Sequence, residues 1–209
     1  MNMRHSRVVV VICGLLPLSA CFVGASRTRY SAPSIDDSTV PVRHVRGVPV
    51  ESMFLLKDIA LYVYPGNEEN GGDVLLFPVP WHTSVPHSNA RPFVVGVGLR
   101  PNQSGFVVNP AEVHLSLKST ANFSPTRILG PAECGAGLAS PAWRSIPVEP
   151  ITLRQGVCTS FTVEFEATTP DPREGFSIDV AGVTRDGVAY ALPTVRFQQK
   201  RRLDPFGAP

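Results

Sequence analysis

The sequence predicts an all-β protein built as an antiparallel β-sandwich, and three observations carry this prediction. Short segments in the C-terminal third alternate apolar and polar residues, as half-buried strands do. Proline and glycine account for 21 and 17 of the 209 residues, which favours many short elements separated by turns over long helices. The tripeptide Arg-Asp-Gly at residues 185–187 separates two apolar segments and is typical of a tight β-hairpin turn.

Several strands follow from these patterns. In residues 161–166, FTVEFE, aromatic and branched residues fall on one face and charged residues on the other. Residues 92–99, PFVVGVGL, predict a central strand in which Gly96 and Gly98 indicate a bulge or a close approach of the backbone. The other expected strands lie at residues 53–64, 74–79, 106–108, 112–117, 176–180 and 188–197.

Three segments have the composition of loops, and they are the candidate binding surface. They span residues 65–73, 80–92 and 121–150, and a 30-residue loop is long for a compact domain. The second and third carry Trp81 and Trp143, which we take as binding candidates. Each tryptophan could instead pack beneath its own loop.

The N-terminal 21 residues, MNMRHSRVVVVICGLLPLSAC, predict a secretory signal peptide. Arg4 and Arg7 precede an apolar run at residues 8–16, and small residues follow it. A transmembrane helix needs roughly 20 apolar residues, so this run is too short to cross a bilayer.

The end of this leader resembles the lipobox of bacterial lipoproteins, because Leu18, Ser19, Ala20 and Cys21 match the family pattern at all four positions. The resemblance implies cleavage after Ala20, lipidation of Cys21 with diacylglyceryl and palmitate groups, and attachment to a membrane through that lipid. Phe22 replaces the aspartate that retains many such proteins in the inner membrane, which favours the outer membrane with the domain facing the periplasm. The alternatives are an ordinary signal peptide that leaves Cys21 as a free thiol, and a leader that stays uncleaved.

The remaining domain organisation follows from composition. Residues 21–50 are polar and contain serine and proline without a strand or helix period, so we expect a lipidated cysteine followed by a flexible tether. Alternatively, residues 40–50 add an edge strand to the domain. Residues 1–20 are then the signal peptide, residues 51–199 the β-sandwich, and residues 200–209 a C-terminal tail.

The strand spacing and the closing hairpin resemble the immunoglobulin-like and fibronectin-like domains of bacterial surface lipoproteins. The resemblance covers roughly residues 54–199. It is architectural, and it implies no functional residues.

The cysteines predict one disulfide. Cys13 lies in the leader and Cys21 carries the lipid by resemblance, which leaves Cys134 and Cys158. Their bond would close a loop of about 25 residues and contribute about 3 kcal/mol. A metal-binding or redox pair is the alternative, but the spacing is not that of a CxxC motif.

The charge balance argues against nucleic acid as a partner. The chain has 19 Lys and Arg against 17 Asp and Glu, and the leader removes Arg4 and Arg7, so the mature chain is neutral. A nucleic-acid binder normally shows a basic stripe. The run at residues 200–202, Lys-Arg-Arg, is the local exception. We interpret it as a solvated end, and the alternative is a contact with acidic lipid or with an acidic surface polymer.

Catalytic and metal-binding motifs are weak. His82 and His87 lie near Trp81 and could ligate zinc or copper if a carboxylate joined them, but two exposed loop histidines are the alternative. The sequence has no Gly-x-Ser-x-Gly elbow. Its paired carboxylates lie in tether or turn segments, where we expect a role in solubility: Asp36 with Asp37, Glu68 with Glu69, and Asp171 with Glu174. We therefore expect no metal, no cofactor and no enzymatic activity.

The sequence thus favours a membrane-anchored envelope lipoprotein that acts as a non-enzymatic structural or protein-binding module. Its protein partner is not identified by any motif. One alternative is an accessory subunit of a secretion or pilus machine. Another is a metal-binding or enzymatic periplasmic lipoprotein that uses the segment from Trp81 to His87.

Overall fold

The computed structural model describes residues 22–36, 40–43, 53–76, 79–85, 89–118, 121–134, 145–146 and 149–205. Over these residues the chain is all-β with antiparallel sheets, as predicted, and it has one short 3-10 helix at Pro110–Glu112. The predicted signal peptide and the predicted lipidation at Cys21 lie outside the described residues. In the described part of the chain, no helix has the length and apolar character to span a membrane.

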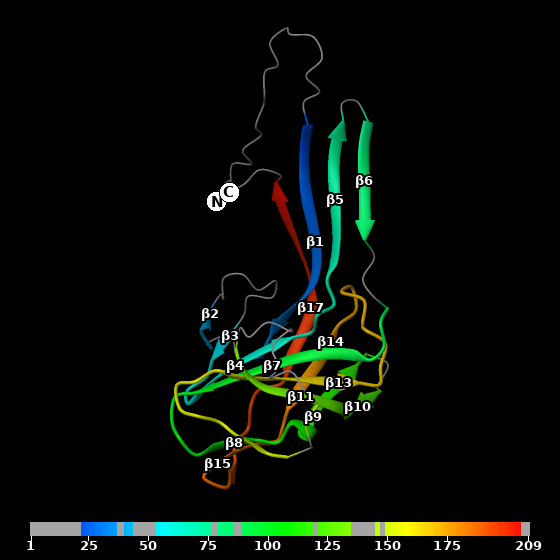
Figure 1. The fold of residues 1–209 in the computed structure, drawn as a ribbon. Helices are drawn as coiled ribbons and strands as arrows, with labels where there is room; N and C mark the ends of the chain where they lie inside the picture. The colour runs from blue at the N-terminus through cyan, green and yellow to red at the C-terminus, as the bar shows by residue number, and fades with distance from the viewer. Residues whose placement is uncertain are drawn as a thin grey trace.

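The strands form three sheets (Figure 1). Sheet A contains, in order across the sheet, β10 (Asn122–Phe123), β9 (Val113–Leu117), β14 (Phe176–Val180), β17 (Val195–Pro205), β1 (Phe22–Ser34), β5 (Glu69–Leu76) and β6 (Val79–Val85). Sheet B contains β11 (Pro125–Glu133), β13 (Thr159–Phe165), β7 (Phe93–Pro101), β4 (Ile59–Tyr64), β3 (Met53–Leu55) and β2 (Val42–Arg43). The small sheet C contains β12 (Ile151–Thr152), β8 (Phe106–Val108), β15 (Val183–Arg185) and β16 (Val188–Ala189).

Sheets A and B face each other across a core of aromatic and branched side chains. Phe93 of β7 meets Phe176 of β14 edge-on with ring centroids 5.7 Å apart, and Phe176 stacks on Phe197 of β17 at 4.6 Å. All three rings are buried. Such contacts between the inner faces of two sheets define a β-sandwich, which confirms the predicted architecture. The more specific immunoglobulin-like character stays a prediction.

The predicted hairpin turn is confirmed. Thr184 pairs with Ala189 and Arg185 pairs with Val188, so that Asp186 and Gly187 form a two-residue turn between β15 and β16. Their φ angles of 51° and 78° are both positive, as this turn requires and as an Asp-Gly pair tolerates. The return segment is short, because after Ala189 the chain crosses to sheet A and enters β17.

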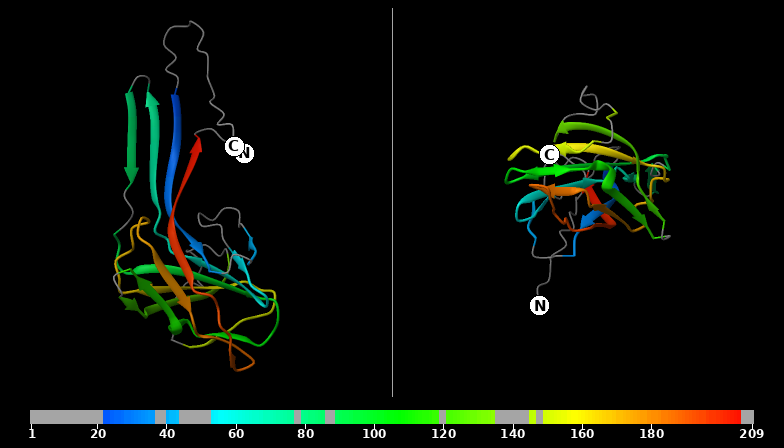
Figure 2. Two further views of the ribbon diagram at one scale, coloured as in Figure 1. Left: turned by 180° about the vertical axis from the view of Figure 1, so that it is seen from behind. Right: turned by 90° about the horizontal axis from the view of Figure 1, so that it is seen from below.

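Four strands of sheet A continue beyond the sandwich as a projecting arm (Figures 1 and 2). The arm consists of β5, β6, residues 22–29 of β1 and residues 201–205 of β17. The prediction of a flexible tether is wrong for Phe22–Ser34, because β1 pairs with β17 on one side and with β5 on the other. The predicted tail at residues 200–209 is likewise wrong for residues 200–205, which belong to β17.

Other expected segments differ in detail. Residues 53–64 form two strands, β3 and β4, that pair as a hairpin. Part of the expected loop at residues 121–150 is strand, because β11 pairs with β13 despite Pro125, Gly130 and Pro131. A register shift between Leu129 and Ala132 accommodates this interruption, which is the role of a β-bulge.

Candidate functional site

Two of the four predicted binding residues lie in the arm. Trp81 and His82 belong to β6, where they pair with Val74 and Asp73 of β5, so the prediction that they lie in a loop is wrong. His87 and Trp143 lie outside the described residues. Within the described ranges, no three His, Cys, Asp or Glu residues are grouped as a metal site would require.

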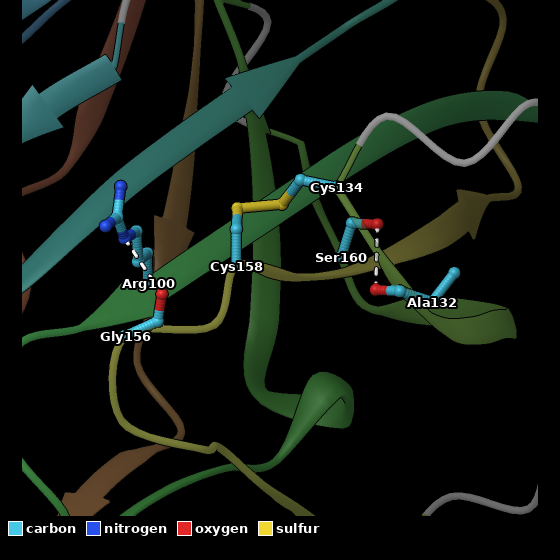
Figure 3. Close-up of a disulfide and its surroundings, with 6 residues drawn as sticks. All are labelled: Arg100, Ala132, Cys134, Gly156, Cys158 and Ser160. Atoms are coloured by element: carbon cyan, nitrogen blue, oxygen red, sulfur yellow. Dashed lines mark hydrogen bonds between the residues drawn. A yellow bond between two sulfur atoms is a disulfide. The ribbon is translucent and has the colours of Figure 1, made fainter.

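The predicted disulfide between Cys134 and Cys158 is present (Figure 3). Their Cα atoms are 5.3 Å apart, and the Cys134 amide donates to the Cys158 carbonyl at 3.0 Å. The bond joins the end of β11 to the start of β13. Nearby, the Ser160 hydroxyl donates to the Ala132 carbonyl at 3.2 Å. The disulfide therefore holds β11, one of the two edge strands of sheet B, against its neighbour β13.

The close approach predicted at the glycines of β7 occurs at Gly98. This residue lies opposite Tyr62 of β4 and Ser160 of β13, which makes β7 a central strand as predicted. A Cβ atom at Gly98 would lie 3.3 Å from the Cys134 sulfur. The lack of a side chain at Gly98 thus leaves room for the disulfide, which lies against β7 at this position.

An ionic cluster at the base of the arm is the main feature that sequence reasoning missed. The buried carboxylate of Glu69, in β5, accepts hydrogen bonds from Arg29 of β1 at 3.2 and 3.4 Å and from Arg173 at 2.9 and 3.2 Å. Arg173 also donates to Asp171 at 2.7 Å, and this bond raises the pKa of the guanidinium further above its already high value. The expectation that Glu69 is a solubilising turn residue is wrong.

A second contact ties the same part of the arm to the sandwich. Asn67 precedes β5 and is buried, and its side-chain amide donates to the Ser31 hydroxyl at 2.9 Å and to the Pro170 carbonyl at 3.0 Å. Asn67 therefore links β1 to the turn at residues 170–173. These bonds connect the base of the arm to the sandwich.

Glu68 lies on the other side of this junction, near Tyr62 and Tyr64 of β4 and Arg202 of β17. Burial raises the pKa of the Glu68 carboxyl, and the positive charge of Arg202 partly opposes this rise. Burial also raises the pKa of both tyrosines. One carboxylate oxygen, Oε1, is buried without a hydrogen-bond partner, so ionised Glu68 is poorly solvated here.

Two open grooves flank the turn at residues 170–175. The first, of about 470 Å³, is lined by Lys118, Arg173 and Arg196 together with Phe176 and Phe197. Arg173 is paired with Asp171 and Glu69, and Arg196 is paired with Asp36, so most of the positive charge is already neutralised. The second groove, of about 630 Å³, includes Arg91 and Glu166, which pair with each other at 2.6 Å.

The arm also presents two sheet edges that no described strand covers. β6 is the last strand of sheet A. β14 pairs with β17 only from Val195 to Phe197, so one side of the rest of β17 has no partner among the described strands. Three exposed basic residues lie along this part of β17, namely Lys200, Arg201 and Arg202.

Comparison with protein-family models, with curated proteins and with solved structures finds no match. The arm, its ionic base and its open edges are the features that distinguish this chain from a plain β-sandwich, and they form the candidate functional site.

Proposed function

We propose that this chain is a lipid-anchored lipoprotein of the bacterial envelope whose β-sandwich is a non-enzymatic structural or protein-binding module. One observation carries the proposal. β1 begins at Phe22, directly after the lipobox cysteine Cys21, at the end of the arm that lies farthest from the sandwich (Figure 1). A lipid on Cys21 would therefore attach at the end of the arm, and the sandwich would lie at the opposite end of the arm from the lipid.

The arm supplies a defined spacing in place of a flexible tether. Residues 22–29 of β1 pair with β5 throughout, and a strand of this length extends about 24 Å at about 3.4 Å per residue. Glu69 and Asn67 fix the base of the arm to the sandwich. The spacing matters because it keeps the sandwich outside the apolar part of the membrane.

The expected compartment is consistent with the covalent chemistry. A disulfide between Cys134 and Cys158 persists in an oxidising environment such as the periplasm. Phe22 follows the anchored cysteine where an inner-membrane protein often has aspartate. We therefore place the anchor in the outer membrane, with the sandwich on the periplasmic side.

The open edges of the arm favour one further candidate function, that of an accessory subunit in a secretion or pilus machine. An exposed edge strand binds a partner by adding its strand to the sheet, and β6 ends sheet A. A subunit of this kind keeps its partner after extraction in mild detergent. If no protein co-purifies, the structural module is favoured over the accessory subunit.

The anchor is tested by the intact mass of the protein extracted from its native membrane. We expect a chain that begins at Cys21 and carries diacylglyceryl and acyl groups, and a gain of two hydrogens when the disulfide is reduced. The Cys21→Ser variant should carry no lipid. A wild-type protein without lipid would overturn the proposed function.

A further inference from the structure

The end of the arm is apolar in every strand that reaches it. Residue 22 of β1 lies in one row with Leu76 of β5 and Val79 of β6, and the next two rows follow in register. These three rows contain residues 22–24, 74–76 and 79–81, which read FVG, VLL and VPW. We call them the tip. Successive residues of a strand alternate between the two faces of a sheet, so both faces of the sheet are apolar at the tip.

Charged residues follow the tip in a fixed order. The next two rows contain Asp73 opposite Ala25 and Asp204 opposite Ser26. The four rows after them form the basic rows, in which residues 27–30 of β1 lie opposite residues 200–203 of β17. The basic rows contain Arg27, Arg29, Lys200, Arg201 and Arg202. Of these, Arg29 is paired with Glu69, and Arg202 lies near Glu68.

Apart from Asp73 and Asp204, this order matches the profile of one leaflet of a bilayer. The first basic row lies about 17 Å from the end of the tip, at about 3.4 Å per residue. Segments that lie in the membrane interface bury apolar residues to about 5–10 Å below the headgroup boundary. The basic rows would then begin at the headgroups, within reach of the negative potential of anionic lipids. Trp81, in the third row, would then come at the membrane–water interface, where tryptophan is enriched in membrane proteins.

We propose that the tip inserts into the outer part of a phospholipid leaflet, while the exposed Lys200 and Arg201 of the basic rows contact its anionic headgroups. The proposal rests on the proposed function, because the leaflet is the one that holds the lipid of Cys21. The arm would then be a second membrane contact beside the lipid, and it would orient the sandwich relative to the membrane.

The pairing of the strands limits the depth of this insertion. β17 ends opposite Ala25, so residues 22–24 of β1 have a described neighbour only in β5, and the outer side of β6 is also open. Unpaired backbone groups are unfavourable in the hydrocarbon core, which restricts the tip to the hydrated interface. Pro80 in the edge strand β6 removes one such donor, as proline does at sheet edges.

The test uses the lipidated protein reconstituted into vesicles of phosphatidylethanolamine and phosphatidylglycerol with brominated acyl chains. The sequence has two tryptophans, so Trp143→Phe leaves Trp81 as the reporter. We expect bromine near the headgroups to quench Trp81 more strongly than bromine at the chain ends. A matched control carries Trp81→Phe, Trp143→Phe and Val188→Trp. Val188 is 70% exposed in β16, in sheet C, and its tryptophan should not be quenched.

The outcomes separate the two proposals. If the mass shows lipid on Cys21 but Trp81 is not quenched, the insertion is overturned and the anchor stands. A blue-shifted emission of Trp81 without quenching indicates that protein covers the tip, which also overturns the insertion. If the mass shows no lipid, the proposed function fails, and the insertion is still tested with the unlipidated chain.

For that purpose the Cys21→Ser chain is produced behind an ordinary signal peptide and mixed with the same vesicles. Leu75→Asp should lower the vesicle-bound fraction at least about tenfold, and Arg201→Gln should lower it about fivefold at low salt. Both variants should retain the disulfide and the unfolding temperature of the sandwich, which shows that they fold. Equal binding of the parent and both variants would overturn the insertion.

Discussion

The guanidinium of Arg173 donates two hydrogen bonds to the carboxylate of Glu69, at 2.9 and 3.2 Å, across a separation of 104 residues in the sequence. Glu69 begins β5, and Arg173 lies in a turn of the sandwich. Because Arg29 of β1 binds the same carboxylate, one buried anion connects two strands of the arm to the body. The orientation of the arm therefore depends on this carboxylate.

Replacing Glu69 with glutamine should destabilise the protein by about 2 kcal/mol, because hydrogen bonds to charged groups contribute about 1.5–3 kcal/mol. The side chain of Glu69 is only 11% exposed and that of Arg29 17% exposed, so the loss of the anion leaves a poorly solvated cation. Urea unfolding of the two proteins measures the difference in free energy.

Glu133→Gln is the matched control for this change. Glu133 pairs with Arg154 at 3.4 Å, but both side chains are 73% exposed, and such surface pairs contribute about 0–1 kcal/mol. If the two variants lose the same stability, Glu69 has no special role at the base of the arm.

Local patterns predicted those parts of the fold that depend on neighbouring residues. The turn at Asp186 and Gly187 was predictable because two adjacent residues carry the required backbone conformation. The buried face of β13 was predictable because Phe161, Val163 and Phe165 alternate with polar residues. The disulfide followed from eliminating the other two cysteines.

The arm was not predictable in the same way. β1 has no alternation of apolar and polar residues, and its partners lie about 45 and 170 residues away in β5 and β17. The ionic base joins Arg29, Glu69 and Arg173, and no local pattern connects them. For the turn that carries Arg173, the sequence did contain a local signal, namely Asp171. Its side chain accepts a hydrogen bond from the Arg173 amide at 2.7 Å, and aspartate commonly forms such turns.

Loss of the disulfide should destabilise the sandwich by about 3 kcal/mol, as expected for a closed loop of this length. The bond joins Cys134 and Cys158 across 24 residues. Thermal unfolding of the wild type with and without reductant measures the effect, and the Cys134→Ala, Cys158→Ala double variant should unfold near the temperature of the reduced protein. An unfolding temperature that reductant does not change would contradict a stabilising bond.

Gly182→Ala should destabilise the protein by about 1–3 kcal/mol, which is the usual effect of overpacking. A Cβ atom at Gly182 would lie 2.5 Å from the Asn109 carbonyl oxygen and 2.7 Å from the Glu112 Cβ. Gly96→Ala is the matched control, because its Cβ would come no closer than 3.8 Å to other atoms. There, alanine should be neutral or stabilising, since it reduces the entropy of the unfolded chain. Equal unfolding temperatures for the two variants would show that Gly182 is not closely packed.

Stability should fall as the pH rises through the pKa of Glu68. Burial raises this pKa above its ordinary value of 4.5 in the folded protein, so the folded state binds a proton that the unfolded state has already lost. The stabilisation is complete below pH 4.5 and is lost as the carboxyl ionises at higher pH.

Glu68→Gln stays neutral at every pH, so its unfolding temperature should exceed that of the wild type near neutral pH and converge with it below pH 4.5. The exposed Glu174→Gln is the control and should show no such convergence. A Glu68→Gln difference that does not change with pH would mean that the carboxyl is already ionised without penalty in the folded protein.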